Sequence, residues 1–171
     1  MIPVQRLNHA VLYVRDAARS ANWYHELFGM EIITEIPGFG AFLRSAGSTN
    51  HHDLGLFSVG PDAPSPEQGR VGLYHLAWQV GSINDLVTAR DDLQRVGAYT
   101  GESDHGATKS IYGKDPDGNE FEVMWMLPRE DWGEYENAAP VDRLDLGAEV
   151  ARWSGVGTAG RILPGSVELT S

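Results

Sequence analysis

The sequence predicts an α+β protein built from two tandem copies of a βαβββ module. Two apolar runs carry the repeat: residues 7–14 read Leu-Asn-His-Ala-Val-Leu-Tyr-Val, and residues 73–80 read Leu-Tyr-His-Leu-Ala-Trp-Gln-Val. The runs start 66 residues apart, and Leu, His and Val recur at matching places. Both runs are rich in β-branched, aromatic and aliphatic residues, which favours strands. Self-similarity at a fixed spacing indicates a duplicated unit.

A helix is expected after each of these strands. In the first module, Asp16 is the expected N-cap, apolar residues then recur with helical spacing, and Gly29 is the expected stop. In the second module, Ser82 opens a segment with capping-box spacing, and Gly97 ends the helix. The two helices are therefore expected at matching places in the repeat.

Three short strands are expected after each helix, because strand-like runs alternate there with turn residues. The expected strands cover residues 30–36, 40–45 and 53–59 in the first module and 99–102, 107–113 and 119–127 in the second. The turn Asp115-Pro116-Asp117-Gly118 precedes the last strand, and its residue types are typical of tight turns. Each half is therefore predicted to have the element order β-α-β-β-β.

The two modules are expected to form one domain over residues 1–127, with the modules at about 5–59 and 71–127. The polar, Pro-rich segment 60–70 is the expected linker. Residues 128–171 lie outside the repeat as a C-terminal extension. We expect this extension to be a surface arm with one short helix; a dimer contact or a lid is the alternative.

Composition excludes several functional classes. The 171 residues carry 13 Lys and Arg against 24 Asp and Glu, a formal charge of −11, which opposes binding to nucleic acid or to an anionic membrane surface. The absence of cysteine excludes disulfides, thiolate metal sites and Cys nucleophiles. No apolar run approaches the roughly 20 residues that span a membrane, and the N-terminus lacks the long apolar segment of a signal peptide. A cytoplasmic protein is expected.

Two histidines occupy the same slot of the repeat. His9 and His75 are each the third residue of the repeated run. If the modules pack about a pseudo-two-fold axis, equivalent slots approach each other, and two imidazoles face one point. The alternative is a pair of core histidines, each satisfied by its own hydrogen bond. The matched positions favour metal ligands.

A third ligand is expected from the last strand of the second module. Glu122 lies between Phe121 and Val123 in a run that is otherwise ready to be buried, and a buried carboxylate is costly unless it is paired or bound to metal. Glu120 shares its phase but lies nearer the turn. Two histidines and one carboxylate with open positions form the facial triad of non-haem Fe(II) oxygenases. Mn(II) also suits this set, and Zn(II) is a further alternative.

With these residues, the sequence resembles the vicinal oxygen chelate superfamily, which includes glyoxalase I, fosfomycin- and bleomycin-resistance proteins and extradiol ring-cleaving dioxygenases. The repeat covers residues 5–127. Its most specific part is the stretch from His105 through Tyr112 and the Asp115 turn to Glu122, which resembles the extradiol dioxygenase signature. The resemblance implies that the two modules form a curved mixed sheet around a metal site. Whether one chain or two copies build the site is left open.

Two features favour the dioxygenase branch. Glyoxalase I resembles this sequence but uses a further glutamate in the first module, and alignment of residues 53–57 with the strand of Glu122 puts Gly55 in that slot. Glycine cannot bind metal, so three ligands remain. In addition, His51-His52 precedes Asp53 where extradiol enzymes carry a His-His or His-Asp element. His52 matches its acid–base histidine, and His51 would then point to the opposite face; a solvated strand entrance is the alternative.

The resemblance implies an extradiol dioxygenase that cleaves a catechol-like aromatic diol and incorporates both atoms of O2, in aromatic-compound breakdown. His9, His75 and Glu122 would bind the metal, with Fe(II) expected first, Mn(II) next, and Zn(II) or Ni(II) last. His52 would move protons, Tyr112 would hydrogen-bond the substrate oxygen, and His105 would orient or protonate a later intermediate.

Three further expectations accompany this assignment. The partners are the diol and O2, with neither nucleic acid nor membrane. A homodimer or higher homo-oligomer is expected. The alternative functions are another metal-dependent enzyme of the superfamily, such as a glyoxalase-like lyase or isomerase, and a resistance protein that sequesters a small molecule.

Overall fold

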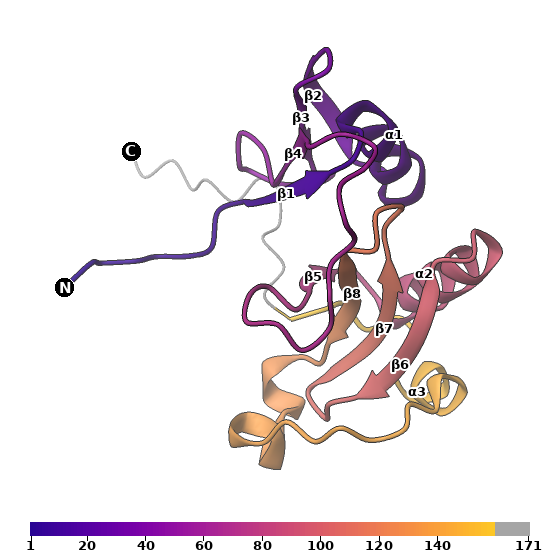
Figure 1. Cartoon of the computed structure of the whole chain (residues 1–171). Coiled ribbons are helices and arrows are strands. Elements are labelled where there is room, and N and C mark those ends of the chain that lie inside the picture. The colour runs from indigo at the N-terminus through magenta and orange to yellow at the C-terminus, as the bar shows by residue number, and fades with distance from the viewer. Residues whose placement is uncertain (160–171) are drawn as a thin grey trace. The chain divides into compact units, whose positions relative to one another are not determined.

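The computed structural model describes residues 1–159, and these divide into two compact units. The first unit is Met1–Pro66 and the second begins at Glu67, so the division falls inside the Pro-rich segment 60–70. Each unit contains one βαβββ module with its own four-stranded sheet (Figure 1). The predicted α+β class and the tandem modules are confirmed.

The first unit builds a mixed sheet with one helix packed on it. Its elements are β1 (Ala10–Val14), α1 (Ala17–Phe28), β2 (Glu31–Ile36), β3 (Gly40–Arg44) and β4 (Leu54–Ser58). The strand order is β1-β4-β3-β2, with β1 parallel to β4 and the other neighbours antiparallel. The Asp16 carboxylate accepts from the Arg19 N–H at the start of α1, and Gly29 ends the helix in the left-handed region at φ 63°.

The second unit repeats this topology. Its elements are β5 (Leu76–Gln79), α2 (Ile83–Arg95), β6 (Tyr99–Asp104), β7 (Thr108–Lys114) and β8 (Glu120–Met126). The strand order is β5-β8-β7-β6, and β5 is parallel to β8. The Ser82 hydroxyl accepts from the Asp85 N–H, which is the expected cap, and Gly97 follows the helix at φ 72°.

The first strand of each module is shorter than predicted. β1 begins at Ala10 and β5 at Leu76, so His9 and His75 directly precede the strands instead of lying within them. The start of β1 is set by its parallel partner β4, which begins at Leu54. One further backbone hydrogen bond, from the Ala10 N–H to the Asp53 carbonyl oxygen, extends this pairing. The two histidines nevertheless keep equivalent places in the two modules.

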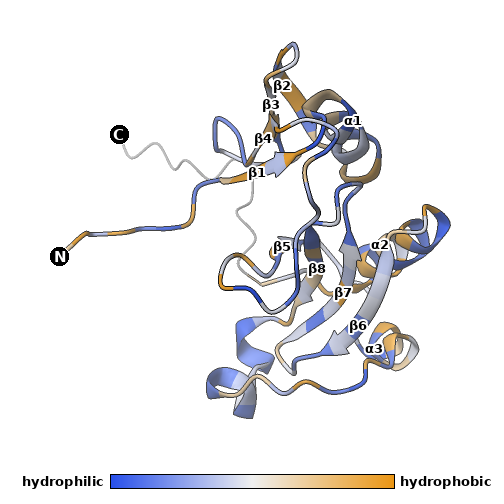
Figure 2. Cartoon of the chain, viewed as in Figure 1, coloured by the Kyte–Doolittle hydropathy of each residue, from blue (hydrophilic) through white to orange (hydrophobic). Residues whose placement is uncertain are grey.

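Apolar side chains from helix and sheet form a core in each unit. In the first unit, the fully buried side chains include Tyr24 of α1 and Leu43 of β3. In the second unit, Leu86 and Leu93 of α2 are buried together with Trp125 of β8. Figure 2 shows hydrophobic and hydrophilic residues side by side along α2, as expected of an amphipathic helix. Burial of each such side chain contributes about 1.5–3 kcal/mol.

The short helix predicted in the C-terminal extension is present, but over residues 128–159 the extension packs on the second unit and does not form a surface arm. It makes two 3₁₀ turns, Arg129–Asp131 and Gly133–Asn137, and then α3 (Leu146–Trp153), which packs against α2. Trp153 is buried, and its ring lies 5.9 Å from that of Trp125. The apolar side chains that the extension buries offset the entropy of ordering it. Residues 160–171 lie outside the described residues.

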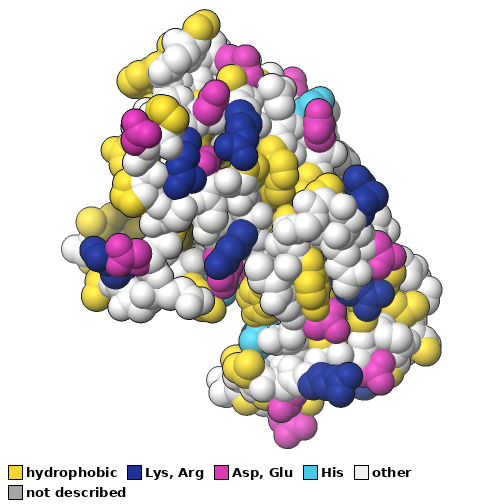
Figure 3. Space-filling view, turned by 45° about the vertical axis from the view of Figure 1, so that its right-hand side comes forward, with side chains coloured by type: hydrophobic (Ala, Val, Ile, Leu, Met, Phe, Trp, Pro, Cys, Tyr) yellow, Lys and Arg dark blue, Asp and Glu magenta, His cyan; other side chains and the backbone are white. Residues whose placement is uncertain are grey.

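Figure 3 shows acidic and basic side chains interspersed on the face in view. No helix within residues 1–159 has both the length and the apolar character needed to cross a membrane.

Candidate functional site

The registers of the two sheets identify equivalent positions in the modules. Val11 of β1 stands opposite Gly55 of β4, and Ala77 of β5, 66 residues after Val11, stands opposite Glu122 of β8. Gly55 is therefore the counterpart of Glu122, as the sequence alignment predicts. The first module offers no carboxylate at this position.

In the second unit, His75 and Glu122 converge. His75 Nε2 lies 3.1 Å from Glu122 Oε2. The Ser110 hydroxyl donates to Glu122 Oε1, so one carboxylate oxygen is held by β7 and the other faces the imidazole. Glu122 is only 9% exposed, and a carboxylate with so little solvent needs such partners.

A second pair of side chains lies beside the first. The Tyr112 hydroxyl lies 2.8 Å from His105 Nε2, and the Tyr112 ring centroid lies 5.7 Å from that of His75. Tyr112 stands opposite Glu122 in the β7–β8 ladder, which explains its place next to the carboxylate. Burial, and then the negative charge of Glu122, raise the pKa of Tyr112 above its usual value of 10.0. Tyr112 therefore remains a neutral hydroxyl at physiological pH.

Both pairs line one cavity of about 760 Å³ in the second unit. Its polar and charged lining also includes Tyr74, Glu102, Lys114 and Glu120. The negative charge of Glu120 raises the pKa of Tyr74. Ala139 and Val141 of the C-terminal extension complete part of the wall. The volume is sufficient for a small aromatic ligand.

In the first unit, His9 and His52 lie together. Their ring centroids are 4.5 Å apart, and the His52 ring also meets the Phe42 ring edge-on at 5.0 Å. His9 Nδ1 lies 2.9 Å from Asn8 Oδ1, which can only accept, so Nδ1 carries the hydrogen and Nε2 keeps a free lone pair. Burial, and then charge on His9 and His51, hold the pKa of His52 below 6.5. His52 is therefore a neutral base near pH 7.

The expectation that His51 points away from His52 is wrong. Their Nδ1 atoms lie 3.1 Å apart, because residues 51–53 precede β4 and do not follow the alternation of a strand. Asp53 anchors this segment. Burial acts to raise the pKa of Asp53, but hydrogen bonds from the Ser45 N–H, the Ser48 hydroxyl and the Asn50 amide outweigh it and hold the pKa below 3.8.

The sequence-predicted site residues therefore fall into two groups. His75, Glu122, Tyr112 and His105 line one cavity of the second unit, and His9 and His52 are in contact in the first. No set of three or more His, Asp or Glu side chains in the described residues is arranged as a complete metal site. The imidazole nitrogen and carboxylate oxygen of His75 and Glu122, 3.1 Å apart, nevertheless match the donor types that Fe(II) and Mn(II) accept.

Sequence reasoning missed three contributors. Ser110 lies within the signature stretch and two residues from Tyr112, so strand alternation places it on the same face and was a usable signal. Lys109 is buried and forms an ion pair with Asp104, the residue before His105. The Pro140 carbonyl oxygen lies 2.7 Å from His105 Nδ1. No pattern in the sequence connects residue 140 with residue 105.

Comparison with known proteins gives consistent results. Residues 6–123 match the family described as the Glyoxalase/Bleomycin resistance protein/Dioxygenase superfamily. A biphenyl-2,3-diol 1,2-dioxygenase of Rhodococcus globerulus is 31% identical over 126 residues, which cover 72% of this chain and 65% of that protein. A catechol-2,3-dioxygenase of Bacillus subtilis is 29% identical over 127 residues, which cover 74% of this chain and 43% of that protein. The chain thus spans less than two thirds of both relatives.

A solved structure shows the same fold. The fosfomycin resistance protein FosX of Listeria monocytogenes, in complex with Mn(II) and a dihydroxypropylphosphonic acid, superposes with a TM-score of 0.60. It is 19% identical to this chain, and the match covers 77% of this chain and 98% of that one.

Proposed function

The chain belongs to the glyoxalase/bleomycin resistance protein/dioxygenase superfamily, and on this premise we propose that it is an extradiol dioxygenase acting on a catechol-like aromatic diol. Two relatives near 30% identity are named as dioxygenases of biphenyl-2,3-diol and of catechol. The observation that carries the proposal is the cavity of the second unit, which combines the His75–Glu122 pair with the Tyr112–His105 pair. The diol and O2 are the substrates, and both oxygen atoms enter the product.

The proposed metal ligands are His75, Glu122 and His9. His75 and Glu122 present a nitrogen and an oxygen 3.1 Å apart, and His9 has its Nε2 lone pair available because Asn8 engages Nδ1. Fe(II) is the proposed metal, Mn(II) is the second choice, and Zn(II) and Ni(II) are less suitable. When bound, Fe(II) would supply the electronic coupling between diol and dioxygen that the spin-forbidden direct reaction lacks.

The remaining residues bind the diol and move protons. Tyr112, neutral at pH 7, hydrogen-bonds a substrate oxygen at the cavity wall, and His105 holds the Tyr112 hydroxyl in place. Ser110 keeps Glu122 oriented by donating to its second oxygen. His52 is the proposed general base, because its lowered pKa leaves it neutral and able to accept a proton from the diol.

The assembly is proposed to be a homodimer or a higher homo-oligomer without nucleic acid or membrane partners. The alternative functions are a metal-dependent lyase or isomerase of the same superfamily and a protein that sequesters a small molecule. Metal dependence distinguishes them from the proposed dioxygenase, because an isomerase retains activity with a redox-inert divalent ion whereas extradiol cleavage requires Fe(II) or Mn(II).

The direct test is anaerobic loading of the full chain with Fe(II), followed by air and a panel of catechols. Ring cleavage is expected to give yellow products with one O2 consumed per diol. A chain that retains Fe(II) but cleaves none of a broad panel would overturn the proposed reaction. His52→Ala is expected to retain iron and lose turnover, whereas His9→Ala and His75→Ala are expected to lose iron.

A further inference from the structure

The C-terminal extension contacts the turn that carries His105. This turn joins β6 to β7, and Gly106 lies in it at φ 74°. The Tyr135 ring packs so closely on Gly106 that a Cβ there would overlap it. Next along the extension, the Pro140 carbonyl oxygen lies 2.7 Å from His105 Nδ1. The extension therefore reaches both the backbone and the side chain of the turn.

The contact with Pro140 decides which ring nitrogen of His105 carries hydrogen. A carbonyl oxygen can only accept, so Nδ1 is the protonated nitrogen. In the neutral imidazole, Nε2 is then an acceptor, and the Tyr112 hydroxyl 2.8 Å away donates to it. With its hydrogen committed to His105, the Tyr112 oxygen can offer only lone pairs to a ligand in the cavity. In the other tautomer, Nε2–H would donate to Tyr112, and Tyr112 would turn its own hydrogen toward the ligand.

Two sets of contacts hold the extension in this position. Asp104, just before His105, and Asp142, just after Val141, exchange both backbone hydrogen bonds, at 3.0 and 2.9 Å. Lys109 is buried and pairs with Asp104 at 2.6 Å and with Glu149 of α3 at 3.5 Å.

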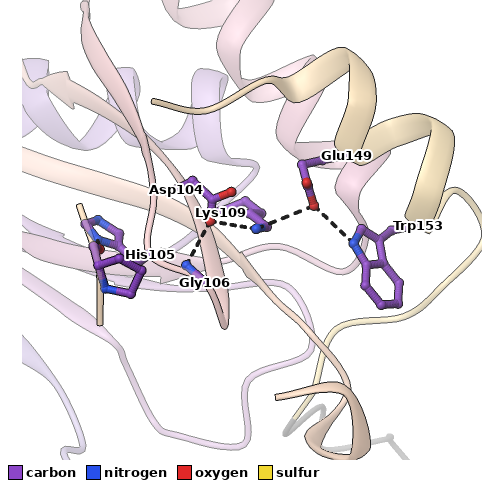
Figure 4. A network of polar contacts seen from close by, with 7 residues as sticks. Asp104, His105, Gly106, Lys109, Glu149 and Trp153 are labelled. Atoms are coloured by element: carbon purple, nitrogen blue, oxygen red, sulfur yellow. Dashed lines mark hydrogen bonds and ion pairs between the residues drawn. The ribbon is translucent and has the colours of Figure 1, made fainter. Parts of the chain in front are cut away.

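Figure 4 shows this network continuing to Trp153, whose indole N–H donates to Glu149, and to the Gly106 N–H, which donates to Asp104. Asp104 thus links the buried lysine, the turn beside His105 and the bridge to the extension. The Lys109–Glu149 ion pair and the Asp104–Asp142 backbone bridge together hold the extension against the turn that carries His105.

We propose that Pro140 is a positioning residue of the active site: its carbonyl holds His105 as the Nδ1–H tautomer, so that Tyr112 accepts a hydrogen bond from a protonated substrate hydroxyl. The inference rests on the proposed function for its catalytic consequence. The tautomer itself follows from contacts within the second unit and is independent of which diol is cleaved.

The test compares two substitutions at one position. Asp142→Pro removes the N–H that bonds to the Asp104 carbonyl, whereas Asp142→Ala keeps it; the Asp142 side chain is exposed. Nitrogen-15 spectra of the full metal-free chain report the His105 tautomer directly, with a His105→Gln spectrum for assignment. The wild-type chain and Asp142→Ala are expected to show Nδ1–H alone, and Asp142→Pro a mixture of tautomers.

A second substitution tests the inference independently, so that it remains testable if Asp142→Pro does not fold. Tyr135→Ala removes the ring that packs on Gly106, and Tyr135→Phe is its matched control. Tyr135→Ala is expected to shift the tautomer ratio in the same direction, and Tyr135→Phe is not. A wild-type His105 with hydrogen on Nε2, or pure Nδ1–H in both Asp142→Pro and Tyr135→Ala, would overturn the inference.

Kinetics separate the inference from the proposed function. With an active wild-type enzyme, kcat of Asp142→Pro is expected to be about tenfold or more below that of Asp142→Ala, since proton-transfer groups contribute about 10²–10⁴-fold. Equal kcat values in the two variants would overturn the catalytic role. If the wild-type chain cleaved no diol, the proposed function would fall, and the tautomer spectra alone would uphold or overturn the inference.

Discussion

Gly55 and Glu122 occupy equivalent register positions in two sheets of identical topology, opposite Val11 and Ala77 respectively. The modules thus differ at the position where a second carboxylate would stand. A Cβ at Gly55 would meet the Phe42 ring and the Val11 side chain at 3.4 Å, which is ordinary contact, so alanine fits there. The backbone at this position of the first module therefore admits a side chain at least as large as a methyl group.

This equivalence provides a matched pair of variants for metal binding. Glu122→Ala is expected to abolish retention of Fe(II), because it removes a proposed ligand, while Gly55→Ala is expected to bind Fe(II) at the wild-type ratio per chain. Elemental analysis after desalting measures both. Retention of Fe(II) by Glu122→Ala at the level of Gly55→Ala and the wild-type chain would contradict Glu122 as a ligand. Gly55→Ala is also expected to raise the free energy of unfolding by about 0.5 kcal/mol, because glycine weakens strand interiors.

The charge of the cavity predicts which diols bind best. Among the described residues, three glutamates line the cavity, Glu102, Glu120 and Glu122, whereas Lys114 is the one lysine in the same lining. The acidic side chains in this lining therefore outnumber the lysine. We expect kcat/KM for an uncharged catechol to exceed that for a catechol bearing a carboxylate by about tenfold, since one unopposed charge interaction of 1.4 kcal/mol is a factor of ten. A double variant that carries both Glu102→Gln and Glu120→Gln is expected to lower this ratio of kcat/KM values. Steady-state oxygen uptake measures it, and a preference for the carboxylated substrate would contradict this reading.

Asp53 predicts a pH-dependent contribution to stability. Its pKa is held below 3.8 in the folded chain, so the folded state binds the proton less readily than the unfolded state. The sign follows: the stabilisation is fully present above about pH 4–5 and is lost as the pH falls through the folded-state pKa. Asp53→Asn is therefore expected to lower the free energy of unfolding by about 1–3 kcal/mol at pH 7. Urea titrations at pH 7 and at pH 3 measure the free energy of unfolding of both chains. The difference between the wild-type chain and Asp53→Asn is expected to be smaller at pH 3.

The buried lysine predicts a graded response in the second unit. Lys109→Met keeps the aliphatic volume but leaves Asp104 and Glu149 without their cation, and is expected to cost about 3 kcal/mol of unfolding free energy. Glu149→Gln keeps the closer pair, Lys109–Asp104 at 2.6 Å, and should cost about 1 kcal/mol. Urea unfolding followed by tryptophan fluorescence measures both, because Trp153 donates to Glu149. A larger loss for Glu149→Gln than for Lys109→Met would contradict this order.

The sequence predicts the fold closely because the signals that specify it are local. Asp16 and Ser82 cap their helices as their residue types require, and Gly29 ends the first helix in the left-handed region. The turn at Asp115 separates two antiparallel strands, with the Asp115 carboxylate accepting from the Asp117 and Asn119 N–H groups. Strand ends were less predictable, because β1 stops where its partner strand stops and that limit is set by another part of the chain.

Some features of the candidate site likewise follow from local sequence, and others depend on distant parts of the chain. The repeat identifies His9 and His75 as equivalent, and strand alternation with an apolar surround singles out Glu122; such deductions need only residue types and periodicity. The contact of Ser110 with Glu122 and the approach of His51 to His52 cannot be deduced in this way, because they depend on side-chain directions across a strand ladder and at a bend of the backbone.

The sequence by itself therefore determined the duplicated module, the acidic and cysteine-free character and the donor types available to a metal. Only the tertiary structure decided that the C-terminal extension packs on the second unit, that Lys109 is buried between Asp104 and Glu149, and that the Tyr112 hydroxyl lies 2.8 Å from His105 Nε2. The reason is physical: His105 and Pro140 are 35 residues apart, and the direction of one hydrogen bond depends on packing that brings them to 2.7 Å. Periodicity carries no record of such a contact.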